Sequence, residues 1–296
     1  MTQRQGGIGI ERLCELGGVA RASYYRCWKR AAPQEAAGEL RDRLQRICLA
    51  HRHYGYRRVR AALRKQGLLV NHKKIRRLMR EDNLLAVRKR KWLITTDSHH
   101  QLAVFPNLAR FMEPDGADQL WVADLTYIRL RSEFLYLAVV LDAWSRRVVG
   151  WALGRELTAS LPKRALLRAI TERSPEPGII HHSDRGVQYA SLEYVAVRHQ
   201  HQIIGSMSRT AYPYDNARCE SFLKTLKQEE IYCQRYSTLE ELRGNLEQFI
   251  EHYYNRCRLH SALGYRPPQE FEEESRQRHA EVSLAASTLT FARGRQ

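Results

Sequence analysis

The sequence lacks the features that mark membrane and secreted proteins. No run of about 18 apolar residues occurs in its 296 residues, and the first fifteen have no apolar stretch of the kind a signal peptide needs. Its six cysteines include no CxxC pair, which argues against zinc and disulfides and for free thiols. Internal repeats and a sustained heptad pattern are also missing. We therefore expect a cytoplasmic protein of two or three modules.

Acidic residues are scarce in the first third of the chain. Residues 1–110 hold 25 Lys and Arg against 8 Asp and Glu, whereas residues 111–296 hold 24 of each. The whole net charge of +17 therefore lies in the first segment. A block this basic attracts polyanions and gains free energy when counterions leave phosphates. Nucleic acid is the favoured partner, although composition alone leaves open a basic tail that serves solubility.

Residues 51–91 carry the pattern of a DNA-binding helical module. A helix with Val59 and Leu63 on its apolar face ends at Gly67, and Asn71 is placed to cap a second, basic helix. This layout predicts a helix-turn-helix, whose second helix enters the major groove of DNA. The candidate DNA contacts are Lys73, Lys74, Arg76, Arg77 and Arg80. A solvated amphipathic helix is the alternative interpretation.

Beyond the basic segment the period changes to that of strands. Three β-rich runs with short connections predict an antiparallel meander, and helix, strand, helix, strand and two helices follow, which is an α/β order. Ser237 and Glu240 form an expected capping box for the last long helix. The expected segments are a helical region (1–50), the helix-turn-helix (51–91), a linker (92–118), a catalytic core (119–275) and a flexible tail (276–296).

Three carboxylates stand out by their positions, although each taken singly is more simply a surface charge. Asp124 lies inside an apolar strand, where an ionised group needs a partner. Asp184 follows the buried strand GIIHH, at a carboxyl end where α/β sheets place their sites. Glu220 shares a helical stripe with Lys224 and Lys227, the candidate phosphate contacts. Converging carboxylates favour Mg²⁺ or Mn²⁺, and two such ions support phosphoryl transfer.

Six sequence blocks in a fixed order accompany these carboxylates. They are HYGYRRV (53–59), WVADLTYI (121–128), LDAWSRRVVGWAL (141–153), HSDRGVQYAS (182–191), YDNARCESFLKTLKQE (214–229) and NRCRLHSALGYRPPQEF (255–271). With Asp124, Asp184 and Glu220 they resemble the DDE transposases of bacterial insertion sequences, in particular the B-frame product of the two-frame family. The resemblance covers most of the chain. It implies a core like that of retroviral integrases, with an RNase H-like fold: a mixed five-stranded sheet with flanking helices.

The resemblance also implies a site, a reaction and partners. Asp124, Asp184 and Glu220 are then ligands of two Mg²⁺ or Mn²⁺ ions, with Lys227 near the DNA. Water attacks at an end of the element and frees a 3′-hydroxyl, which then attacks a second phosphodiester. The implied DNA partners are the inverted-repeat ends and the target, bound by a homo-oligomer at the bacterial nucleoid. An A-frame product, fused to or paired with this chain, is implied as a further partner.

Other interpretations stay open at this point. A nuclease with the same metal site would only hydrolyse DNA, and a regulator or decayed remnant would leave the triad idle. Ala211 stands where the family commonly has Gly, which changes the backbone angles open to that loop. The block 255–271 fits either a structural cap or a DNA contact through Arg256, Arg258 and His260.

Overall fold

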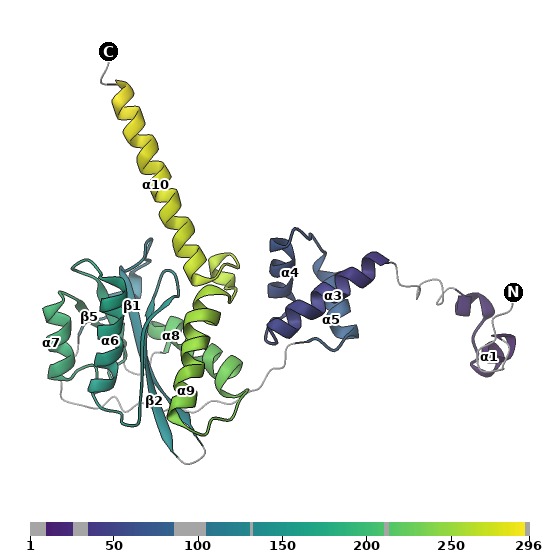
Figure 1. Cartoon of the computed structure of the whole chain (residues 1–296), viewed down its shortest axis with the longest axis horizontal. Helices are drawn as coiled ribbons and strands as arrows, with labels where there is room; N and C mark the ends of the chain where they lie inside the picture. Colours follow the sequence, from purple (N-terminus) through teal and green to yellow (C-terminus); the bar gives the residue numbers. More distant parts are fainter. Residues whose placement is uncertain (1–9, 26–34, 86–104, 131–132, 210–212, 294–296) are drawn as a thin grey trace. The chain divides into compact units, whose positions relative to one another are not determined.

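The computed structural model describes residues 10–25, 35–85, 105–130, 133–209 and 213–293. The chain divides into two compact units, Met1–Val87 and Arg88–Gln296, which Figure 1 colours from purple to yellow along the sequence. The basic run 88–91 and Ala211 lie outside the described residues. Within the described ranges, no helix combines the length and the apolar character needed to cross a membrane.

Three helices form the core of the first unit, and the short helix α1 (Ile10–Leu16) precedes them. The three are α3 (Glu35–Ala50), α4 (Tyr56–Lys65) and α5 (His72–Glu81). Their buried side chains, with those of the connections between them, are Leu40, Leu44, Ile47, Cys48, Tyr54, Val59, Leu63, Ile75, Leu78 and Met79. Arg41 of α3 pairs with Glu81 and Asp82 at the end of α5. Apolar burial and these ion pairs hold the three helices together.

The predicted helix-turn-helix is confirmed in α4 and α5. Gly67 follows α4 with φ at +79°, a left-handed conformation that glycine adopts at little cost. The Asn71 side chain caps α5 by accepting a hydrogen bond from the Lys73 backbone N–H at 2.9 Å. In addition, α3 packs against α4, so a helix upstream of the predicted pair belongs to the same unit.

A five-stranded sheet forms the centre of the second unit (Figure 1). The strands are β1 (Leu120–Arg129), β2 (Phe134–Asp142), β3 (Val148–Gly154), β4 (Ile180–Ser183) and β5 (Ile204–Met207), in the order β3-β2-β1-β4-β5. The first three form the predicted antiparallel meander, and β4 and β5 run parallel to β1. The mixed sheet that the resemblance to RNase H-like cores implied is therefore confirmed.

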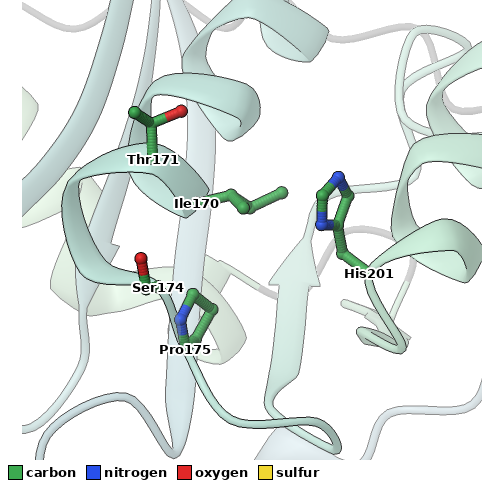
Figure 2. Close-up of a pocket in the computed structure, with 5 residues that line it drawn as sticks. All are labelled: Ile170, Thr171, Ser174, Pro175 and His201. Atoms are coloured by element: carbon green, nitrogen blue, oxygen red, sulfur yellow. The ribbon is translucent and has the colours of Figure 1, made fainter.

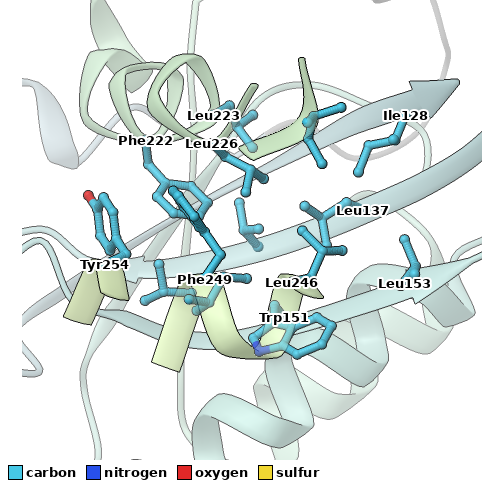
Figure 3. Close-up of a cluster of buried hydrophobic side chains, with 14 of the residues drawn as sticks. Ile128, Leu137, Trp151, Leu153, Phe222, Leu223, Leu226, Leu246, Phe249 and Tyr254 are labelled. Carbon is cyan, nitrogen blue, oxygen red and sulfur yellow. The ribbon is translucent and has the colours of Figure 1, made fainter. Parts of the chain in front are cut away.

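Helices cover both faces of this sheet. They are α6 (Ser160–Arg173), α7 (Leu192–Gln200), α8 (Ala217–Leu226) and α9 (Leu239–Glu247). One face, with Trp121 of β1, packs against α6 and α7. The other face, with Leu120 and Val122, packs against α8 and α9, and Figure 3 shows this core. Because side chains alternate between the faces of a strand, Asp124 belongs to the face that α8 and α9 cover.

Two helices of the second unit change their winding near their ends. α8 continues into the π-helix Lys227–Ile231, and α9 continues into the π-helix Gln248–Tyr254. Short 3₁₀ turns complete the elements: Ala109–Phe111, Pro213–Asn216 and Ser261–Leu263. π-Turns inside helices are rare and occur often at functional sites.

The cap of α9 corrects one sequence prediction. Thr238, not Ser237, is the N-cap: its hydroxyl accepts from the Glu241 backbone N–H at 3.1 Å, and Glu241 accepts from the Ser237 backbone N–H at 2.8 Å. The box predicted from Ser237 and Glu240 is wrong by one residue. Either frame fits the sequence pattern, and burial of Leu239 as the first helical residue selects the later one.

The end of the chain also differs from expectation. The tail expected to be flexible from residue 276 is helical as far as the end of α10 (Pro268–Arg293). This segment is rich in good helix formers such as Ala, Glu and Arg, which favour a continuous helix. Near its start Glu272, 1% exposed, pairs with Arg173 at 2.8 Å and with Arg147 at 3.1 Å.

Candidate active site

β1 and β4 place two of the predicted carboxylates at neighbouring positions of the sheet register. The strands are parallel, with Val122 opposite His182. When this register is continued by two residues, Asp124 stands opposite Asp184, which directly follows β4. The pairing of β4 with β1 stops at Val122, so the backbone of β1 beyond this point needs another partner on that side.

Asn216 supplies that partner. Its side-chain amide donates a hydrogen bond to the Ala123 carbonyl at 2.8 Å, next to Asp124. Because Asn216 directly precedes α8, the bond fixes the first turn of α8, with Glu220, beside β1. The Asn216 side chain is buried, and its Oδ1 has no hydrogen-bond partner within the described part of the chain.

The charges of Asp184 and Glu220 influence the pKa of Asp124. Burial raises the pKa of Asp124 to about 8, and the charges of Asp184 and Glu220 add to the rise. The Leu125 backbone N–H, which donates to Asp124 Oδ1 at 2.8 Å, opposes the rise, as does the charge of Lys227. Partial burial also raises the pKa of Glu220. A nearby cation would favour the ionised form of such a group.

The residues fit a divalent cation by their chemistry. Across the ranges that the structure describes, no three His, Cys, Asp or Glu side chains converge closely enough to hold a metal ion. Mg²⁺ does not require three, because it usually binds through one or two carboxylates and keeps several waters. The donors are oxygen atoms only, which suits Mg²⁺ and Mn²⁺. The repulsion between the Asp124 carboxylate and those of Asp184 and Glu220 gives a physical reason for a cation to bind there.

Lys227 lies beside Tyr127 of β1, and Lys224 lies on the surface. The Lys227 Nζ is 5.1 Å from the centre of the Tyr127 ring of β1. Burial lowers the pKa of Lys227, and the charge of Asp124 works against that change. Lys224 and Glu220 are both exposed on α8. One end of this site is therefore open to solvent.

Models of known families match both units. An integrase core domain matches residues 114–213, a second integrase core domain model matches 201–268, and an HTH-like domain matches 35–92. The chain is 38% identical over 270 residues to the insertion element IS600 uncharacterized 31 kDa protein of Shigella sonnei. This match covers 90% of this chain and 99% of that protein. It is 35% identical over 284 residues to the transposase InsF for insertion sequence IS3A of Escherichia coli (strain K12), which covers 93% and 98%. The chain belongs to the IS3 family of insertion-sequence transposases.

The transposase is a DDE-type polynucleotidyl transferase that acts on DNA, as the sequence predicts. Among solved structures it is similar to a simian T-cell lymphotropic virus intasome, with a TM-score of 0.45 and 17% identity over 77% of this chain and 74% of that chain. It is also similar to the HTLV-2 integrase catalytic core domain in complex with magnesium, with a TM-score of 0.43 and 16% identity over 54% of this chain and 99% of that chain.

Five of the seven basic residues predicted to contact DNA lie in the first unit of the transposase. All five are exposed on α5: Lys73, Lys74, Arg76, Arg77 and Arg80. The Arg76 guanidinium lies 5.3 Å from the centre of the Tyr56 ring, and Arg77 lies 3.5 Å from Glu81. The two lysines at the start of α5 therefore carry exposed charge directly after the capped turn.

The block 255–271 is structural at two of the three positions that the sequence left open. Arg258 is buried and pairs with Glu229 at 2.7 Å. His260 is also buried, with its ring 4.8 Å from that of Tyr254 and nearly perpendicular to it. Arg256 is exposed. Arg258 and His260 therefore brace the core of the transposase, and Arg256 alone of the three faces solvent.

A pocket of about 420 Å³ lies away from the carboxylates (Figure 2). It is lined by Ile170, Thr171, Ser174, Pro175 and His201, at the ends of α6 and α7. Ile170 and His201 point toward one another across it. None of the predicted site residues lines this pocket, so it is not the candidate active site.

Sequence reasoning did not place Tyr189 in the site. This residue is 1% exposed and packs its ring on that of Tyr194. Burial raises the pKa of Tyr189, and the charges of Asp184 and Asp124 are among the further causes. The one sequence signal is spacing: Tyr189 follows Asp184 by five residues, and a backbone bond from the Tyr189 N–H to the Gly186 carbonyl closes the turn between them.

Proposed function

We propose that Asp124, Asp184 and Glu220 are the catalytic triad of the transposase and that they hold two Mg²⁺ or Mn²⁺ ions. The observation that carries the proposal is that, in addition to burial, Asp184 and Glu220 both raise the pKa of Asp124 by their charges. Asn216 supports the arrangement, because it binds the β1 backbone at Ala123, next to Asp124. When bound, two such cations activate an attacking oxygen and stabilise the leaving oxygen of a phosphodiester.

The chain's own groups hold these carboxylates in place. The Leu125 N–H donates to Asp124 Oδ1, and the Gly186 N–H donates to Asp184 Oδ1 at 3.0 Å. Lys227 offers a positive charge to a phosphate beside Asp124, and Lys224 offers a second one on the exposed surface of α8. Phosphoryl transfer depends mainly on positioning and on charge stabilisation, so a protein nucleophile is not needed.

We further propose that the transposase cleaves the ends of its insertion sequence and joins the freed 3′-hydroxyl to target DNA. The exposed basic face of α5, from Lys73 to Arg80, then contacts the inverted repeats. Assembly as a homo-oligomer on the DNA, action at the nucleoid in the cytoplasm and joint action with an A-frame product belong to the same proposal. They follow from the resemblance to two-frame insertion sequences.

A strand-joining assay tests the site and the reaction together. The transposase, with its A-frame product, is incubated with a labelled element end, target DNA and Mg²⁺. We expect joined product from the unaltered protein and none from Asp184→Asn, which keeps the shape of the side chain and removes its charge. The control is Asp115→Asn, a change on an exposed carboxylate of the second unit that should leave joining intact.

Two results would contradict the proposal. Cleavage without joining would instead favour a nuclease that only hydrolyses DNA. Joining that persists in Asp184→Asn would show that the assigned triad is wrong, whatever the reaction.

A further inference from the structure

Tyr189 carries a buried hydroxyl that has no hydrogen-bond partner among the described residues. Its side chain is 1% exposed, so water cannot serve as the partner from the surface. A buried hydroxyl without a partner has lost its bonds to water and gained none, which disfavours the folded state. Native proteins leave few such groups, and an unpaired one often awaits a ligand or has a role in catalysis.

The Tyr189 ring is fixed in its position. It packs edge-on against the Tyr194 ring, with centres 5.3 Å apart and planes at 82°, and its centre lies 6.4 Å from that of His181. The Tyr189 backbone N–H donates to the Gly186 carbonyl at 3.0 Å, which closes the turn that follows Asp184. The ring and the backbone of Tyr189 are therefore both held in the turn that follows Asp184.

Tyr194 in the same aromatic cluster provides a contrast. Its hydroxyl is also buried, but it shares a hydrogen bond with His181 Nε2 at 3.0 Å. Burial raises the pKa of both tyrosines, and only for Tyr189 do the charges of Asp184 and Asp124 add to the rise. The two hydroxyls therefore differ in surroundings: one completes a pair inside the core, and the other belongs to the hydrogen-bonded turn after Asp184 and has no partner among the described residues.

We propose that Tyr189 is a positioning residue, whose hydroxyl donates a hydrogen bond to the carboxylate of Asp184 when that carboxylate binds a divalent cation. The inference rests on the proposed function, because it requires Asp184 to be a metal ligand. Groups that hydrogen-bond to ligating carboxylates orient them and strengthen metal binding. In the loaded protein the Tyr189 hydroxyl would therefore have a partner.

The test is Mn²⁺ binding by the full-length protein without DNA. Isothermal titration calorimetry and electron paramagnetic resonance measure this binding. Tyr189→Phe removes the hydroxyl and keeps the ring. We expect the dissociation constant for Mn²⁺ to rise about tenfold. The melting temperature without metal should stay the same or increase, because the variant removes an unpaired buried group. Mn²⁺ should therefore raise the melting temperature of Tyr189→Phe less than that of the unaltered protein.

Tyr194→Phe is the matched control, because it removes a hydroxyl that already has a partner. It should lower the metal-free melting temperature, since His181 loses its hydrogen bond, and leave the affinity for Mn²⁺ unchanged. If Tyr189→Phe behaves in the same way, Tyr189 is merely structural and the inference is wrong.

The remaining outcomes separate this inference from the proposed triad. If Asp184→Asn abolishes Mn²⁺ binding while Tyr189→Phe binds like the unaltered protein, the triad stands and the role of Tyr189 is refuted. If the unaltered protein binds no Mn²⁺, or Asp184→Asn binds it equally well, the metal site and the role of Tyr189 are refuted together.

Discussion

Asn255 holds the backbone of Val148 with both ends of its side-chain amide. Its Oδ1 accepts a hydrogen bond from the Val148 N–H at 3.0 Å, and its Nδ2 donates to the Val148 carbonyl at 3.0 Å. Val148 begins β3, an outer strand of the sheet, and Asn255 is 2% exposed. A side chain thus takes the place of a neighbouring strand, and it ties the end of α9 and its π-helix to the meander.

Replacing Asn255 by Ala should destabilise the transposase. Both backbone groups of Val148 would remain buried without partners, and we expect the free energy of unfolding to fall by about 2–4 kcal/mol. Urea unfolding followed by circular dichroism measures this change. Arg256→Ala alters the exposed neighbour and should cost less than about 0.5 kcal/mol. Equal effects of the two changes would contradict the role given to Asn255.

The buried pair of Arg258 and Glu229 makes a second prediction. The two side chains are 5% and 7% exposed and approach to 2.7 Å. Arg258→Met should cost about 3–5 kcal/mol, because it leaves the buried Glu229 carboxylate without the Arg258 cation. Adding Glu229→Leu should recover part of the loss, as measured by unfolding in urea. A double variant less stable than Arg258→Met would argue against this account.

An exposed ion pair serves as the control for that experiment. Arg155 and Glu133 lie 3.0 Å apart, with Arg155 60% exposed. Because solvent screens such a pair, Arg155→Met should change the free energy of unfolding by less than about 1 kcal/mol.

The pH dependence of stability should reflect His181. Burial, followed by the charge of Arg198, lowers the pKa of His181 to about 3, against about 6.5 in an unfolded chain. The unfolded state therefore binds the proton more readily, so stability is full above pH 6.5 and falls as the pH drops toward 3. The double change of His181 and Tyr194 to Phe removes the titrating group with its partner. Urea unfolding between pH 6.5 and 4 should show a shallower slope for this variant, and an unchanged slope would be contrary to expectation.

DNA affinity should depend on the lysines that open α5. If Lys73 and Lys74 neutralise phosphates, changing both to Ala should reduce the slope of log affinity against log salt by about 0.9 for each lost contact. Titration of labelled duplex DNA at several salt concentrations measures the slope. Lys163→Ala provides a control, because that lysine of the second unit is already paired with Glu193 at 2.7 Å. A slope that responds only to Lys163 would exclude α5 as the DNA-binding helix.

Local patterns in the sequence were sufficient to predict the strands and the helix-turn-helix but not the contacts that join the elements. The left-handed Gly67 and the Asn71 cap each depend on residues within one turn, so the helix-turn-helix could be read directly. The ion pair of Arg173 and Glu272 joins residues 99 positions apart, and no local period reports such a pair. It forms because tertiary packing brings the start of α10 to the end of α6.

The candidate site shows the same division. Asp124 was recognisable because a carboxylate inside an apolar strand needs a partner, and the order of the sequence blocks supplied Asp184 and Glu220 through the resemblance. The part played by Asn216 was not predictable, because it depends on where β4 stops pairing with β1. The unpaired hydroxyl of Tyr189 likewise becomes visible only when its surroundings can be inspected.

The π-helix at Lys227–Ile231 makes the number of residues in this stretch as important as their identity. A π-turn accommodates one residue more than an α-turn, so it is equivalent to a single-residue insertion absorbed without breaking the helix. Deleting one residue there would restore α-helical winding and rotate everything that follows by about 100° around the helix axis. Glu229 would lose Arg258, while Glu220, about two turns before the π-helix, would keep its place. We therefore expect alignments of related transposases to show no gaps in this segment, even at positions where substitutions are tolerated.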